Sequence, residues 1–234
     1  MKSHFRFLSG VAAVLAAGIL PVCASTVTYN FGEVSGGTAP AGSPPWLQAV
    51  FSDTATPNSV QLTLSAGNLA GSEFVSCLYF NLNPTLDPTA LSFSLSGSNP
   101  SIQTGANAFK AGPDGKYDLL LGFSTASGSR FANGDSLTFT ISGIGLTAND
   151  FDYLSTAAGG SGAYASAAHI QSIDPDGLSG WVNPTSTVLS PADTTGASVP
   201  DGSETVILLG ISLIGIECVR RAASHRFAVS PSVR

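Results

Sequence analysis

Hydrophobic and polar residues alternate along much of the middle of the chain. Val60, Leu62 and Leu64 alternate with polar residues, and the same period of two recurs in segments 91–96 and 137–142. Because successive side chains of a strand point to opposite faces, this period predicts half-buried β-strands with a polar outer face. Other strand candidates, with weaker alternation, are segments 27–31, 47–51, 74–82, 117–123 and 165–170.

Turn-forming residues separate these strand candidates. Pro, Asn, Asp and Gly cluster between them, as in Asn133-Gly134-Asp135. Short strands at this spacing predict an all-β domain over residues 25–182, an antiparallel β-sandwich or jelly-roll-like fold. Segment 147–154 predicts one short helical turn with Thr147 as its cap. Residues 183–198 are rich in Pro, Ser, Thr and Ala and predict a linker.

The amino-terminal residues, 1–24, have the pattern of a secretory signal peptide. Lys2 and Arg6 precede an apolar run, and small residues follow it. The run is too short to span a bilayer comfortably, so it predicts an amino-terminal signal helix that signal peptidase removes between Ala24 and Ser25. Two alternatives are a lipoprotein processed at Cys23 and a retained amino-terminal anchor.

A second apolar run lies near the carboxyl terminus. Residues 205–219 have no polar face of helical period, and Arg220 and Arg221 follow directly. The run is shorter than the roughly 20 residues of a simple spanning helix, but the positive-inside rule would keep the arginine pair on the cytoplasmic side. The sequence therefore predicts a single transmembrane helix over 205–219 and a cytoplasmic tail over 222–234. A buried helix of a soluble core is the alternative.

The carboxyl-terminal segment 199–221 resembles the sorting signal of PEP-CTERM proteins, in its Val-Pro-Asp variant. Three parts carry the resemblance and occur in order: a Pro-containing motif, the apolar run and the arginine pair. In that family, an exosortase in the inner membrane cleaves near the Pro motif, and the domain goes to the cell surface or the medium. The resemblance assigns the sorting motif to Val199, Pro200, Asp201 and Gly202, and the stop-transfer cluster to Arg220 and Arg221. Segments across 27–182 also resemble a recurrent β-rich domain of PEP-CTERM cargo proteins, which implies no activity.

Charge and cysteine content exclude several classes of protein. The formal net charge is -6, and the only bases between the two end segments are Lys110, Lys116 and Arg130. A nucleic-acid-binding protein needs a dense basic surface, so no nucleic-acid partner is expected. The 3 cysteines cannot build a disulfide framework or a four-thiolate zinc site.

Few side chains of the predicted domain are candidates for catalysis or ligand binding. His169 is its sole histidine and Cys77 its sole cysteine. A catalytic histidine needs a nucleophile or carboxylate partner, and a reactive thiol needs a context that lowers its pKa. The sequence supplies neither pattern, so we expect structural roles for both residues. Trp46 and Trp181 predict core packing or, alternatively, a platform on which a sugar ring stacks.

Pairs of carboxylates on predicted turns are candidate ligands for a calcium ion. The pairs are Asp114 with Asp118, Asp150 with Asp152, and Asp174 with Asp176. Oxygen ligands on turns suit calcium, although none of the pairs has the spacing of an EF-hand loop. No cofactor is predicted, and calcium stays an option beside ordinary turns.

The export signals predict an exported, non-enzymatic protein, and the resemblance to PEP-CTERM proteins implies that it belongs to the cell surface or extracellular matrix and is associated with exopolysaccharide. Its expected partners are signal peptidase, an exosortase-like membrane protease and, before processing, the inner membrane. The alternative is a carbohydrate-binding module, with or without calcium, and a secreted hydrolase is the third hypothesis.

Overall fold

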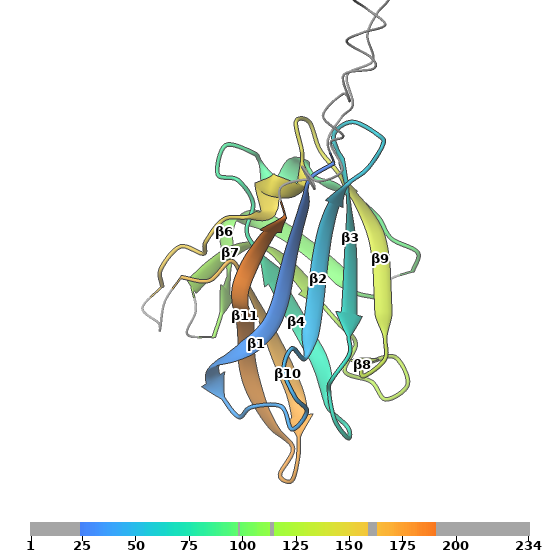
Figure 1. Cartoon of the computed structure of the whole chain (residues 1–234), viewed down its shortest axis with the longest axis vertical. Coiled ribbons are helices and arrows are strands. Elements are labelled where there is room, and N and C mark those ends of the chain that lie inside the picture. Colours follow the sequence, from blue (N-terminus) through green and yellow to red (C-terminus); the bar gives the residue numbers. More distant parts are fainter. Residues whose placement is uncertain (1–23, 98, 113–114, 159–162, 191–234) are drawn as a thin grey trace, which may run out of the picture.

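The computed structural model describes residues 24–97, 99–112, 115–158 and 163–190. These residues form an antiparallel β domain (Figure 1). Its strands are β1 (Thr26–Gly37), β2 (Leu47–Asp53), β3 (Ser59–Ala66), β4 (Phe74–Phe80), β5 (Ser92–Ser94), β6 (Ser101–Ala111), β7 (Gly115–Gly122), β8 (Phe131–Ala132), β9 (Ser136–Ser142), β10 (Ser166–Ile173) and β11 (Leu178–Ser190). Two short 3-10 turns, η1 (Pro88–Ala90) and η2 (Ala148–Phe151), complete it.

All strands belong to one curled sheet. The strand order is β5-β9-β3-β2-β1-β11-β10-β4-β7-β6, and β8 pairs with β4 outside this path. Phe51 of β2 and Phe80 of β4 are separated by three strands in this order, yet their ring centroids lie 5.0 Å apart. Neighbouring strands are spaced by about 4.8 Å, so this contact requires the two halves of the sheet to face each other. The predicted antiparallel β architecture is confirmed.

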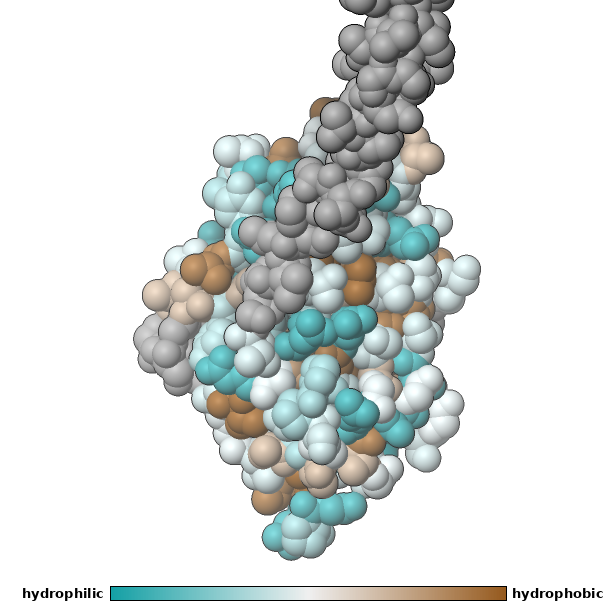
Figure 2. Space-filling model, viewed as in Figure 1, coloured by the Kyte–Doolittle hydropathy of each residue, from teal (hydrophilic) through white to brown (hydrophobic). Residues whose placement is uncertain are grey.

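One hydrophobic core fills the space between the facing halves. Tyr29, Phe51, Phe80 and Phe151 form its centre, and all four are fully buried. Phe151 of η2 stacks on Phe51 with ring centroids 4.1 Å apart, so η2 closes the core near the start of β1. Figure 2 shows that polar residues cover most of the visible outer surface, with apolar residues scattered among them.

The predicted strand segments all lie in or overlap strands of the structure, and the helical turn is confirmed. Thr147 is the N-cap of η2, as predicted, and its backbone N–H and hydroxyl donate to the Asp150 carboxylate Oδ2 at 2.8 and 2.9 Å. The main difference concerns β11, which runs to Ser190 and includes the start of the segment predicted as a linker. Pro184, which lacks an N–H, lies opposite Phe31 where the pairing of β1 with β11 is irregular, so the strand tolerates it.

The predicted terminal helices fall outside the described residues. This holds for the signal segment up to residue 23 and for the run 205–219. Within the described ranges, no helix is both long and apolar enough to span a membrane.

Candidate functional site

The end of the sheet where β1 begins is the first candidate site. Thr26, the first residue of β1, lies opposite Ser190, the last residue of β11. The two strands run side by side in Figure 1, and the chain enters and leaves the domain at the same end. Of the predicted cleavage pair, Ala24 is exposed and Ser25 is half-buried. The bond before Ser25 therefore lies just outside β1, next to a residue whose backbone N–H and carbonyl are both hydrogen-bonded to Asp53.

The remaining predicted site residues lie beyond Ser190, in the part of the chain that the structure does not describe. They are Val199, Pro200, Asp201 and Gly202 of the sorting motif and Arg220 and Arg221 of the stop-transfer cluster.

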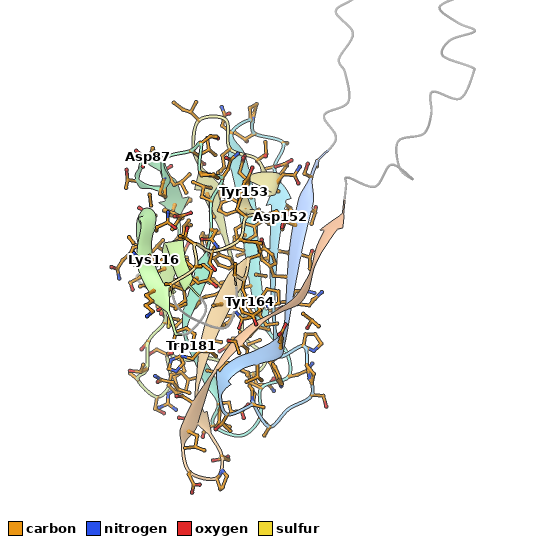
Figure 3. The ribbon with its side chains drawn as sticks, turned by 90° about the vertical axis from the view of Figure 1, so that its left-hand side faces the viewer. Asp87, Lys116, Asp152, Tyr153, Tyr164 and Trp181 are labelled. Carbon is orange, nitrogen blue, oxygen red and sulfur yellow. The ribbon has the colours of Figure 1, made fainter. Side chains whose placement is uncertain are left out.

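The second candidate site is an aromatic cluster on the outer face of β11, β10, β4 and β7. We call it the outer cluster; it comprises Cys77, Tyr79, Phe109, Ala111, Tyr117, Leu120, Ala167 and Trp181. Trp181 stacks on the imidazole of His169 with ring centroids 4.6 Å apart, and Tyr79 lies 5.8 Å from the Trp181 ring. Figure 3 labels Trp181 on this side of the molecule. The outer cluster and the core together cover both faces of β4.

Gly112, which begins the turn between β6 and β7, lies against the outer cluster. Gly112 has φ +41°, and a Cβ at this position would lie 2.7 Å from the ring of Trp181. Asp118 fixes the bulge in β6, because its carboxylate accepts hydrogen bonds from the backbone N–H groups of Asn107 at 2.7 Å and Leu82 at 2.9 Å. The Trp181 ring is thus held between His169 and this turn.

A β-bulge places a serine beside His169. The pairing of β4 with β10 shifts between His169 and Ile170, so Ser76 is the extra residue of β4. The Ser76 Oγ lies 2.9 Å from His169 Nδ1 and 3.1 Å from the His169 carbonyl oxygen, to which it can donate. The bulge also moves Val75 into the core, whereas strict alternation would put it on the face of Cys77.

Burial shifts the pKa values of Cys77, Tyr79 and His169 in the directions that favour their neutral forms. Burial raises the pKa of the Cys77 thiol and of the Tyr79 hydroxyl, and it lowers the pKa of the His169 imidazole. A protonated thiol is a poor nucleophile. Within the described residues, no carboxylate is hydrogen-bonded to the His169 ring, so the Ser76–His169 pair lacks the group that orients the base in a triad.

The two tryptophans do not form a common surface. Trp46 is 5 % exposed, belongs to the core between the sheet halves, and donates from Nε1 to the Gly42 carbonyl at 2.6 Å. Trp181 lies in the outer cluster. A sugar platform built from both rings is therefore not formed.

Of the turn carboxylates considered as calcium ligands, Asp114 lies outside the described residues. Asp118 accepts hydrogen bonds from the backbone N–H groups of Leu82 and Asn107, and Asp150 accepts them from Asn83 and Thr147. Asp174 and Asp176 lie exposed in the turn between β10 and β11. In the described ranges, no three His, Cys, Asp or Glu side chains converge as a metal site would require.

Comparisons with protein-family models, curated proteins and solved structures give no significant match. The geometry of the two candidate sites therefore carries the functional argument.

Replacing His169 with glutamine should reduce the acid sensitivity of the fold. Because burial lowers the folded-state pKa of His169 below 6.5, the unfolded chain binds the proton first as the pH falls. The stabilisation is complete above about pH 6.5 and is lost as the pH falls toward the folded-state pKa. Unfolding by urea, measured from pH 7.5 to 5, should show a steeper loss for the wild type than for H169Q. Parallel curves for the two proteins would contradict this expectation.

Proposed function

We propose that the chain is an exported, non-enzymatic protein of the cell surface or extracellular matrix, sorted by an exosortase-like membrane protease. In this proposal the precursor is held in the inner membrane by residues 205–219 and released or transferred after cleavage near Pro200. The β domain is the cargo, and its two halves form a β-sandwich of the jelly-roll kind. Association with exopolysaccharide follows from the resemblance of the sorting signal.

One structural observation supports this proposal. Thr26 and Ser190 lie opposite each other, so the connections to the signal peptide and to the sorting signal leave the same end of the domain. This arrangement suits a precursor whose two termini are both directed to one membrane. The sequence pattern of residues 199–221 supplies the second argument.

Intact mass and terminal peptides of the chain, expressed with both end segments in an exosortase-containing host, test the proposal. We expect a species that begins at Ser25 and ends near Pro200, with any extra mass marking an attached group. Replacing Arg220 and Arg221 with alanine should greatly reduce this species. A matched control, Arg226→Ala, changes an arginine beyond the predicted cluster and should leave processing intact. Recovery of an uncut chain that retains Arg234 in the wild type would overturn exosortase sorting.

Carbohydrate binding is the second candidate function. A shallow groove beside the loop after β7 is lined mainly by polar side chains, which can hydrogen-bond to sugar hydroxyls, and its one aromatic residue, Phe123, is buried with its ring stacked on Phe131. Its lining residues are Asn99, Ser101, Gly122, Phe123, Ser124 and Ser129. Retention of the same exported protein on the host's exopolysaccharide, with and without EDTA, separates this function from a purely structural one.

A further inference from the structure

Asp53, the last residue of β2, joins three segments at the end of the sheet where β1 begins. Its Oδ2 accepts a hydrogen bond from the backbone N–H of Ser25 at 2.8 Å, and its Oδ1 accepts one from Ala148 of η2 at 2.7 Å. The backbone N–H of Asp53 donates in return to the Ser25 carbonyl at 3.0 Å. One carboxylate therefore holds the nitrogen of the residue that follows the predicted cleavage site.

Cleavage before Ser25 would change the chemistry of that nitrogen. The neutral amide N–H would become an α-amino group, which is mostly protonated and therefore positively charged at pH 7. Hydrogen bonds between ionised partners are about twice as strong as neutral ones. Ser25 is also positioned through its side chain, because Asn149 Nδ2 donates to its Oγ at 3.3 Å. The oxygen that accepts the amide proton in the structure is thus placed to accept the ammonium proton.

We propose that Asp53 is a binding site for the α-ammonium group of the processed chain. Removal of the signal peptide then adds an ion pair that fastens the start of β1 to β2 and η2. The inference rests on the proposed export, since the free amino group exists only after cleavage between Ala24 and Ser25. It assigns Asp53 a role specific to the mature protein, because the precursor offers this carboxylate only a neutral amide.

Among the charged and titratable groups around this site, Asp53 is the one that contacts the Ser25 nitrogen. Asp150 turns its carboxylate to Thr147 and to the Asn83 amide. Burial and the charge of Asp152 raise the pKa of the Tyr29 hydroxyl, which donates to the Phe151 carbonyl. Burial raises the pKa of Asp152 as well. Within the described residues, no lysine or arginine forms an ion pair with Asp53.

Competitive acetylation of the exported protein tests the proposal. Trace acetic anhydride modifies only unprotonated amines, and mass spectrometry of the amino-terminal peptide reports both the cleavage site and the labelling of Ser25. Lys110 and Lys116 of the same chain serve as internal standards for reagent exposure. At pH 7, we expect the Ser25 amine of D53N to be labelled about three- to tenfold faster than that of the wild type, since a tenfold change corresponds to one pKa unit. At pH 10, where both amines are largely unprotonated, the ratio should approach one.

Asp118→Asn is the matched control, because Asp118 also accepts two backbone N–H groups but lies away from the amino terminus. It should leave the labelling of Ser25 unchanged. Equal rates for D53N and the wild type at pH 7 would overturn the ammonium site. A difference that persists at pH 10 would also overturn it, because it would report fraying of β1 rather than protonation. A mature chain that begins at another residue would overturn the predicted cleavage and the site together, whereas equal rates on a chain beginning at Ser25 would overturn the site alone.

Discussion

Replacing Phe51 with alanine is expected to lower the free energy of unfolding by about 3–5 kcal/mol, the range for truncating a large buried aromatic side chain. Phe51 is 0 % exposed, and its ring contacts Tyr29, Phe80 and Phe151 with centroid distances of 6.2, 5.0 and 4.1 Å. These partners come from β1, β4 and η2, so no single neighbouring strand can move in to fill the cavity. Urea unfolding of the purified exported protein measures the loss.

Phe93→Ala provides the matched control for this prediction. Phe93 lies on the edge strand β5, is only partly buried, and has its nearest ring partner, Phe139, at 6.4 Å. Its truncation should cost less than half as much as that of Phe51. Equal losses for the two variants would mean that the contact between the facing halves of the sheet does not carry the stability we assign to it.

The most clearly predicted strands have one face in the core and one face outward, so apolar and polar residues alternate along them. In β3, for instance, Leu62 and Leu64 point to the core while Gln61 and Thr63 face outward. β6 escaped prediction because small and polar residues dominate it and its pairing is interrupted between Thr104 and Phe109. Local alternation also cannot identify a distant partner. The pairing of β1 with β11, which joins the halves into one sheet, depends on residues more than 140 positions apart in the chain.

The outer cluster, too, could not be predicted from local sequence patterns, because its residues come from strands far apart in the chain. The sequence drew attention to Cys77, His169 and Trp181 one at a time, and it assigned His169 a structural role. Strand register brings them together, since His169 lies opposite Cys77 on one side and Trp181 on the other. The position of Ser76 depends on a bulge that no turn residue or glycine marks in β4. Sequence reasoning therefore identified Cys77 and Trp181 of the outer cluster and the adjacent His169, but it missed Ser76 and the stacking of His169 on Trp181.

Replacing Glu73 with alanine is expected to cost about 3–6 kcal/mol of unfolding free energy, because it removes two hydrogen bonds to a charged acceptor, which contribute about 1.5–3 kcal/mol each. Glu73 is 2 % exposed, and its two oxygens accept from the backbone N–H groups of Ala41 at 2.7 Å and Ala70 at 2.8 Å. The side chain thus connects the loop between β1 and β2 to the loop between β3 and β4. Alanine would remove both acceptors and leave a cavity.

The variant E73Q distinguishes the contribution of the two hydrogen bonds to stability from the contribution of side-chain packing. E73Q keeps the shape and one acceptor oxygen, but its amide group meets the second N–H with a donor, so we expect about half the loss of E73A. Urea unfolding of the two exported variants beside the wild type gives the comparison. If E73Q were as stable as the wild type while E73A lost its full share, the cavity rather than the paired N–H groups would account for the effect. That result would contradict the role assigned to the carboxylate, because only a charged group with two acceptors can satisfy both loops at once.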